Sequence, residues 1–187
     1  MKKLFVIAMI IAINALITPN VNAKNQKGVY MTAKDYMDQK MTYKTNAKMH
    51  VNNSVWELPY ITVIDSNKKI KLNKAKIFAY ADGDKVYRFY KNEPYQIVEA
   101  APITIYVFNE HVAQSKGYKI KQTYYFSTSP DGTMIPLTIS NVKQAYRSND
   151  RFLDLLDQYF SNGDVTAYDA VHHSYKLNYV YNKTLVK

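Results

Sequence analysis

Alternation of apolar and polar residues is strongest in the middle of the chain. Two β-rich runs, Ile77 to Tyr80 and Val86 to Tyr90, lie on either side of the dipeptide Asp82-Gly83. An Asp-Gly pair accepts the positive φ angles of a type I′ turn, so these runs predict a β-hairpin. The next run, Ile103 to Phe108, is apolar on both faces except at Thr104. That pattern predicts a strand in the middle of a sheet.

Further alternating runs flank this centre. Val55 to Ile64 predicts a strand that a proline interrupts, and Lys69 to Leu72 places two lysines on one face and two apolar residues on the other. Tyr118 to Phe126 predicts another strand, whereas the polar segment Asn109 to Gly117 predicts a connection. Together the runs predict an antiparallel sheet of about five to seven strands over residues 55–126.

The apolar period changes from two to about 3.6 residues after Gly132, which predicts C-terminal helices. A short helix is expected to be capped by Ser140, and the clearest helix starts at Ser148 or Asn149. Its apolar side carries Phe152, Leu153, Leu155, Leu156, Tyr159 and Phe160. Residues 168–183 fit either a helix or a closing strand. The predicted fold class is therefore α+β, an antiparallel β-sheet packed on one face by C-terminal helices.

Near the start, Thr32 precedes a short segment with Asp35 three residues on, the pattern of a capped helix. Before it, residues 1–23 have the pattern of a secretory signal peptide: two lysines, an apolar run, and Val21-Asn22-Ala23 as a cleavage site. The predicted mature chain, residues 24–187, is a single α+β domain that is periplasmic or extracellular. The apolar run is short for a membrane span, which needs about 20 residues, although a retained anchor is the alternative.

Composition adds three points. The chain has no cysteine, so it forms no disulfide and carries no lipid on an N-terminal cysteine. Its formal net charge of +10 favours anionic neighbours such as envelope glycans, lipid headgroups or acidic envelope proteins. Export argues against nucleic acid as the physiological partner. The 18 tyrosines each combine an apolar ring with a polar tip, which suits half-buried sheets and binding surfaces alike.

Several different short segments, most of them aromatic, are distributed along the predicted mature chain. They are Gly28 to Thr32 with Asp35-Tyr36, Phe78 to Tyr80 with Tyr87-Arg88, Tyr95, Ile105-Tyr106, Leu137-Thr138 with Asn141, and Tyr168-Asp169 before Tyr175 and Asn178. In this order they resemble small exported proteins of unknown function from Bacteroidota. The resemblance implies a location in the cell envelope and no particular activity.

Five residues are the candidate binding residues of a tyrosine-rich, basic sheet face: Arg88, Tyr87, Tyr90, Lys69 and Lys71. A lysine-rich run near Lys69 suits acidic glycans or lipid headgroups, although lysines also protect edge strands from aggregation. Arg88 either stacks on tyrosines at an exposed face or reaches a carboxylate, and a structural role is the alternative. The predicted function is a non-enzymatic binding or scaffolding module of the envelope.

The alternative prediction is a small envelope hydrolase. Asp169 and His173, four residues apart on one face of a helix, would orient a proton shuttle or hold part of a metal site. The chain has no Gly-x-Ser-x-Gly motif and no phosphate-binding glycine loop. No catalytic residue, cofactor or metal is therefore predicted with the main function. An oligomeric structural subunit is the third class considered.

Overall fold

The computed structural model describes residues 26–45, 49–51, 58–65, 68–161 and 163–185. The predicted signal peptide, residues 55–57 of the predicted strand and the turn at 66–67 lie outside these ranges. Within them, no helix has the length and apolar character needed to cross a membrane.

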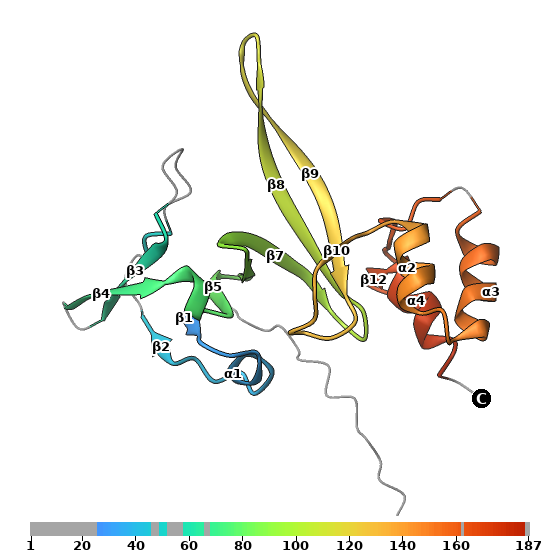
Figure 1. The fold of residues 1–187 in the computed structure, drawn as a ribbon, viewed down its shortest axis with the longest axis horizontal. Helices are drawn as coiled ribbons and strands as arrows, with labels where there is room; N and C mark the ends of the chain where they lie inside the picture. Colours follow the sequence, from blue (N-terminus) through green and yellow to red (C-terminus); the bar gives the residue numbers. More distant parts are fainter. Residues whose placement is uncertain (1–25, 46–48, 52–57, 66–67, 162, 186–187) are drawn as a thin grey trace, which may run out of the picture.

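The centre of the molecule is an eight-stranded antiparallel sheet in the order β10-β9-β8-β7-β6-β5-β1-β2 (Figure 1). Its strands are β1 (Gln26–Tyr30), β2 (Tyr43–Lys44), β5 (Ala79–Gly83), β6 (Lys85–Tyr90), β7 (Glu93–Ala100), β8 (Thr104–Gln114), β9 (Gly117–Ser127) and β10 (Ile135–Pro136). With a few helices added, the fold class is α+β, as predicted. The sheet is larger than the predicted one because β1, from the N-terminal part of the described chain, pairs with β5, and β10 pairs with β9 at the other edge.

Two predicted strands form a sheet of their own. β3 (Tyr60–Asp65) and β4 (Lys68–Asn73) pair only with each other among the described strands, so the prediction that they belong to the central sheet is wrong. The two strands contact the central sheet through side-chain packing instead of backbone pairing. Their apolar residues Ile61, Val63 and Leu72 share a buried cluster with Val29, Tyr80 and Phe89 of the central sheet.

The central hairpin β5–β6 is confirmed, but its turn differs from the prediction. Asp82 pairs with Lys85, so the two loop residues are Gly83 and Asp84. Only Gly83 has a positive φ, at 71°, whereas a type I′ turn needs positive φ at both loop residues. That condition is met in the next turn, at Lys91 and Asn92, with φ of 52° and 68°.

The predicted connection Asn109 to Gly117 is instead mostly strand. β8 and β9 pair without interruption from Thr104 opposite Ser127 to Gln114 opposite Gly117. Residues 109–122, called the arm from here on, are exposed on both faces and project beyond the sheet (Figure 1). Because neither face of the arm is buried, residues 109–117 carry no apolar alternation, and their polar composition was misread as a loop, whereas the strand predicted from Tyr118 is confirmed as part of β9.

Two of the predicted helix caps are confirmed. α1 (Ala33–Met37) begins with a capping box in which Thr32 Oγ1 accepts the Asp35 N–H and the Asp35 carboxylate accepts the Thr32 N–H. α3 (Asp150–Tyr159) begins after Asn149, whose side chain accepts the Phe152 N–H.

The cap predicted at Ser140 is wrong. Thr138 has an extended backbone and accepts the Asn141 N–H, so α2 (Ile139–Ala145) starts earlier. The ambiguous segment after residue 168 contains both alternatives: β11 (Tyr168–Asp169) and β12 (Ser174–Tyr175) form a hairpin that leads into α4 (Lys176–Asn182). A 3₁₀ turn, η1 (Lys74–Lys76), follows β4.

Neighbouring residues of β8 belong to two different buried clusters. Ile105 and its partner Phe126 on β9 share one with residues of the C-terminal helices, namely Val142, Phe152, Leu156, Leu177 and Val180. Tyr106 belongs to another, which contains Tyr30, Tyr36, Ala79, Ala81, Val86, Ile97 and Met134. The alternation follows from the two-residue period of a strand, which points neighbouring side chains to opposite faces.

Candidate functional site

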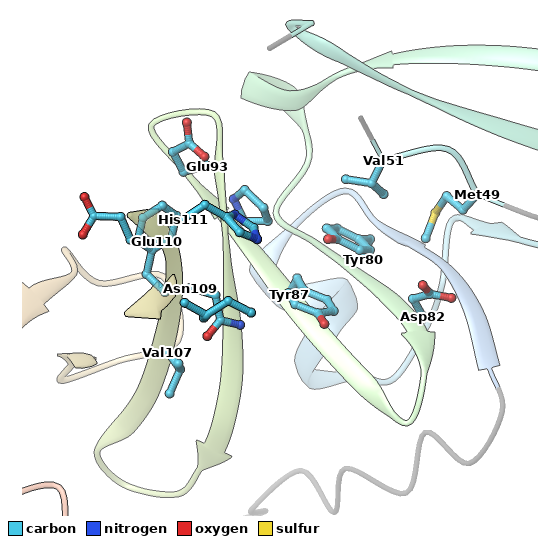
Figure 2. Close-up of a pocket in the computed structure, with 13 residues that line it drawn as sticks. Met49, Val51, Tyr80, Asp82, Tyr87, Glu93, Val107, Asn109, Glu110 and His111 are labelled. Carbon is cyan, nitrogen blue, oxygen red and sulfur yellow. The ribbon is translucent and has the colours of Figure 1, made fainter. Parts of the chain in front are cut away.

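A pocket of about 530 Å³ lies between the base of the arm and the hairpin β5–β6 (Figure 2). Its lining residues come from β5, β6, β7, β8, β9 and the segment before β3: Met49, Val51, Tyr80, Asp82, Tyr87, Glu93, Pro94, Val107, Phe108, Asn109, Glu110, His111 and Ile120. We call this pocket the cleft.

Two tyrosines form the aromatic wall of the cleft. Tyr80 and Tyr87 are cross-strand partners, and their rings stack with centroids 5.0 Å apart and planes at 13°. Phe89, two residues beyond Tyr87, supports the Tyr80 ring from the same face of β6, at 5.2 Å. Burial is the main cause that raises the pKa of both tyrosines, so their hydroxyl groups stay protonated and neutral at physiological pH.

The polar lining of the cleft is acidic. Three carboxylates, from Asp82, Glu93 and Glu110, line it, together with the Asn109 amide and the His111 ring. No lysine or arginine is among the described residues that line it, although Lys27 forms an ion pair with Asp82 at 3.1 Å. The local field therefore favours a neutral or cationic ligand, in a chain whose overall charge is +10.

Arg88 faces away from the cleft and is buried, with 6% of its surface exposed. It donates from Nη1 to the Tyr106 hydroxyl at 3.0 Å and from Nη2 to the Asp131 carbonyl oxygen at 3.1 Å. Its guanidinium lies 5.2 Å from the centre of the Phe78 ring and 5.8 Å from that of Tyr90. Arg88 therefore joins β6, β8 and the turn after β9, which is the structural alternative considered from the sequence.

The two candidate lysines lie on the separate sheet. Lys69 and Lys71 are both exposed on β4, where they line a different pocket with His50 and Thr62. Lys71 Nζ lies 4.7 Å from the centre of the Tyr60 ring. The lysine run is not a continuous stripe, because Lys74 is only 2% exposed.

The structure therefore does not bring the five candidate binding residues together. Tyr87 lines the cleft, Arg88 and Tyr90 lie on the opposite face of β6, and the two lysines belong to β4. Adjacent residues of a strand point to opposite faces, so Tyr87 and Arg88 cannot share one surface.

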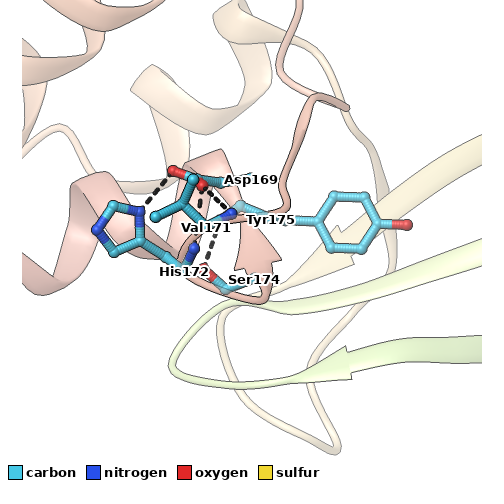
Figure 3. A network of polar contacts seen from close by, with 5 residues as sticks. All are labelled: Asp169, Val171, His172, Ser174 and Tyr175. Atoms are coloured by element: carbon cyan, nitrogen blue, oxygen red, sulfur yellow. Dashed lines mark hydrogen bonds and ion pairs between the residues drawn. The ribbon is translucent and has the colours of Figure 1, made fainter.

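The predicted pair Asp169 and His173 is not formed. These residues lie on a hairpin rather than a helix, so the four-residue spacing does not align them, and His173 is exposed in the turn with φ of 50°. Asp169 instead accepts from His172 Nδ1 at 2.7 Å and from the backbone N–H groups of Val171 and His172 (Figure 3). The side-chain hydrogen bond from His172 is the main cause that holds the pKa of Asp169 below its ordinary value.

These contacts stabilise the turn between β11 and β12. The His172 ring packs on the Tyr179 ring with centroids 4.0 Å apart, and Ser174 Oγ donates to the Tyr175 carbonyl oxygen at 3.5 Å rather than to the imidazole. Within the described ranges, no three His, Cys, Asp or Glu side chains are placed to hold a metal ion. The hydrolase alternative thus loses the geometry on which it depended.

Two residues of structural importance were not recognised as such from the sequence. Asn178 bonds both backbone groups of Ile103, and the Glu99 carboxylate accepts the Tyr175 N–H at 2.9 Å. Neither carries a local signal, because each partner is about 75 residues away along the chain. Tyr80 had a partial signal, since alternation along the predicted hairpin places it on the same face as Tyr87, whereas the observed register sets the two residues directly opposite each other.

Comparisons of the chain with protein-family models, with curated proteins and with solved structures found no match. The resemblance to exported Bacteroidota proteins therefore stays a prediction.

Proposed function

We propose that this chain is an exported, non-enzymatic binding protein of the cell envelope, and that the cleft binds a neutral or amino-bearing saccharide. The observation that carries the proposal is the half-buried Tyr87 ring in a pocket of about 530 Å³, which is held in place by stacking on the Tyr80 ring, itself only 4% exposed. Pockets that combine apolar and aromatic walls with a few polar groups are the usual sites for small ligands.

The chemistry of the lining supports a saccharide. The apolar C–H face of a sugar ring packs on an aromatic ring, while its hydroxyl groups donate hydrogen bonds. Asp82, Glu110 and Asn109 supply acceptor oxygens around the two rings. An amino group on the sugar would be favoured further by the three carboxylates, and an acidic sugar would be disfavoured.

This ligand differs from the anionic partner favoured by composition alone. The total charge counts lysines wherever they lie, whereas the described lining of the cleft contains carboxylates and no lysine. Acidic envelope glycans therefore remain candidates for other surfaces only.

The signal-peptide pattern of residues 1–23 supports the envelope location. The absence of an Asp169–His173 pair removes the support for a hydrolase.

We also infer that the C-terminal helices cover one face of the sheet over β8 and β9. Ile105 and Phe126 are cross-strand partners, which point to the same face, and they share a buried cluster with Phe152, Leu156 and Leu177. Tyr106, the residue after Ile105, belongs to a different cluster. Val107, which lines the cleft, lies two residues further along the same face of β8, so the helices would cover the base of this face and leave the cleft and the arm beyond it free.

A glycan array that contains neutral, amino-bearing and acidic saccharides tests the proposed ligand. The folded mature chain should bind neutral or amino-bearing members, and Tyr87→Ala should lower the affinity about tenfold through the lost stacking. Tyr168→Ala is the matched control, because Tyr168 is exposed on β11, away from the cleft.

Circular dichroism of both variants would establish that each is folded. Binding only to acidic saccharides, or equal affinity of Tyr87→Ala and Tyr168→Ala, would overturn the proposal.

A further inference from the structure

The arm is a two-stranded ribbon without cover. Beyond Val107 on β8 and Tyr124 on β9, the two strands bond only to each other within the described parts of the chain. An isolated two-stranded hairpin is marginally stable in water, so the eight-stranded sheet at its base holds the arm in place. The outer end of the arm projects away from the rest of the molecule (Figure 1).

Apolar side chains gather near the tip of the arm. Val112, Tyr118 and Ile120 are exposed by 38%, 75% and 56%. They come from both faces of the ribbon: Tyr118 is the partner of Ala113, and Val112 is the partner of Lys119. Because both faces carry apolar groups, the tip itself, rather than one side of the arm, is suited to enter an apolar medium.

The charges of the arm are mainly positive. Lys116, Lys119 and Lys121 outnumber the single carboxylate of Glu110. None of the three lysines is in an ion pair with a described residue. Apolar and tyrosine side chains mixed with lysines are the composition that proteins place at the boundary between lipid headgroups and acyl chains.

A second copy of the chain fits the arm less well. Pairing along the free edge of β9 would bring Lys119 and Lys121 of two copies close together, and like charges opposite one another weaken a sheet. Lysines on an edge strand are a common protection against such pairing.

We propose that the tip of the arm docks the protein on an anionic lipid bilayer. Val112 and Tyr118 enter the boundary between headgroups and acyl chains, and the long side chains of the lysines reach the lipid phosphates. Val112 and Tyr118, unlike Ile120, are not among the described residues that line the cleft, and the variants below leave Ile120 unchanged, so the two proposals are tested independently.

Sedimentation with vesicles tests the docking. Vesicles of phosphatidylcholine with about one third phosphatidylglycerol should bind the mature chain, and vesicles of phosphatidylcholine alone should bind it much less. Each lysine near an anionic surface contributes about fivefold to the binding constant, so Lys119→Gln with Lys121→Gln should weaken binding roughly 25-fold. Tyr118→Ser with Val112→Ser should weaken it about tenfold or more.

Two matched double variants distinguish binding through the arm from non-specific electrostatic or hydrophobic binding by other surfaces of the chain. Lys68→Gln with Lys69→Gln removes the same charge from β4 and should leave vesicle binding within about twofold of the wild type. Tyr168→Ser with Val171→Ser removes the same side-chain types from exposed positions of 58% and 82%, and should also leave binding nearly unchanged.

The chain lacks cysteine, so a single engineered cysteine accepts one environment-sensitive dye. A dye on Tyr118→Cys should shift to the blue on anionic vesicles, and a dye on Tyr168→Cys should not. The proposal is overturned if wild-type protein does not bind the vesicles, if the β4 or β11 controls lose as much binding as the arm variants, or if the arm variants change only self-association in light scattering. The assay contains no saccharide, so its result does not depend on the cleft.

Discussion

Replacing Asn178 with leucine tests how α4 is joined to the sheet. Asn178 is 1% exposed and Ile103 is 0% exposed. The side-chain oxygen of Asn178 accepts the Ile103 N–H at 3.0 Å, and its amide nitrogen donates to the Ile103 carbonyl oxygen at 2.8 Å. One side chain thus satisfies both backbone groups of a buried residue, as a neighbouring strand would do.

The expected cost follows from those two hydrogen bonds. Leucine has a similar volume, so packing is kept, but both backbone groups of Ile103 lose their partner away from water. An unsatisfied buried group costs about 1–3 kcal/mol, which makes about 2–6 kcal/mol for the pair. For a chain of this length, about 2–4 °C of melting temperature accompanies each kcal/mol, so Asn178→Leu should melt about 4–24 °C lower.

Urea and thermal unfolding followed by circular dichroism measure this loss, and hydrogen exchange of the Ile103 amide locates it. Asn182→Leu is the matched control, since Asn182 is exposed on the same helix, and its effect should stay within about 0.5 kcal/mol. If Asn178→Leu is no less stable than this control, or if the Ile103 amide exchanges as slowly as before, the reasoning about the join is refuted.

Three further predictions concern stability. Leu156→Ala should lower the free energy of unfolding in urea by about 2–5 kcal/mol, whereas Leu185→Ala, at an exposed position, should change it by less than about 0.5 kcal/mol. Gly28→Ala should destabilise the pairing of β1 with β2, since a Cβ there would clash with the Tyr43 carbonyl oxygen; unchanged hydrogen exchange in both strands would contradict it. Burial raises the pKa of Glu99, so the folded state holds that proton more tightly and unfolding free energy falls as pH rises from the ordinary glutamate pKa through the folded one. Glu99→Gln should remove this fall, and urea titrations with the same slope against pH as the wild type would count against it.

Elements with a buried face were predictable from the sequence. The helix Asp150–Tyr159 and the strand around Ile105 each bury part of their surface, so apolar residues recur with the period of the element. Thr32 and Asn149 cap helices through contacts within three residues, which a local pattern captures. In each case the sequence signal and the physical cause lie within the same short segment.

Pairings between distant segments were not predictable. The place of β1 beside β5 depends on a strand about 50 residues away, and the separation of β3–β4 from the central sheet depends on a buried face shared with Tyr80 and Phe89. Alternation of apolar and polar residues indicates that a strand has a buried face, but it does not indicate which surface covers that face. The grouping of Arg88 with Lys69 and Lys71 failed for the same reason.

The arm and the cleft show why the sequence-based site was incomplete. A ribbon exposed on both faces needs no apolar period, so Asn109 and His111 were assigned to a loop, yet the ladder between β8 and β9 carries them to one wall of the cleft. The opposite wall is Tyr80 stacked on Tyr87, which is set by the register of the adjacent hairpin. One wall of the cleft therefore depends on the pairing of β8 with β9 beyond Val107, where the burial of β8 ends. Variants that shorten the arm should remove this wall.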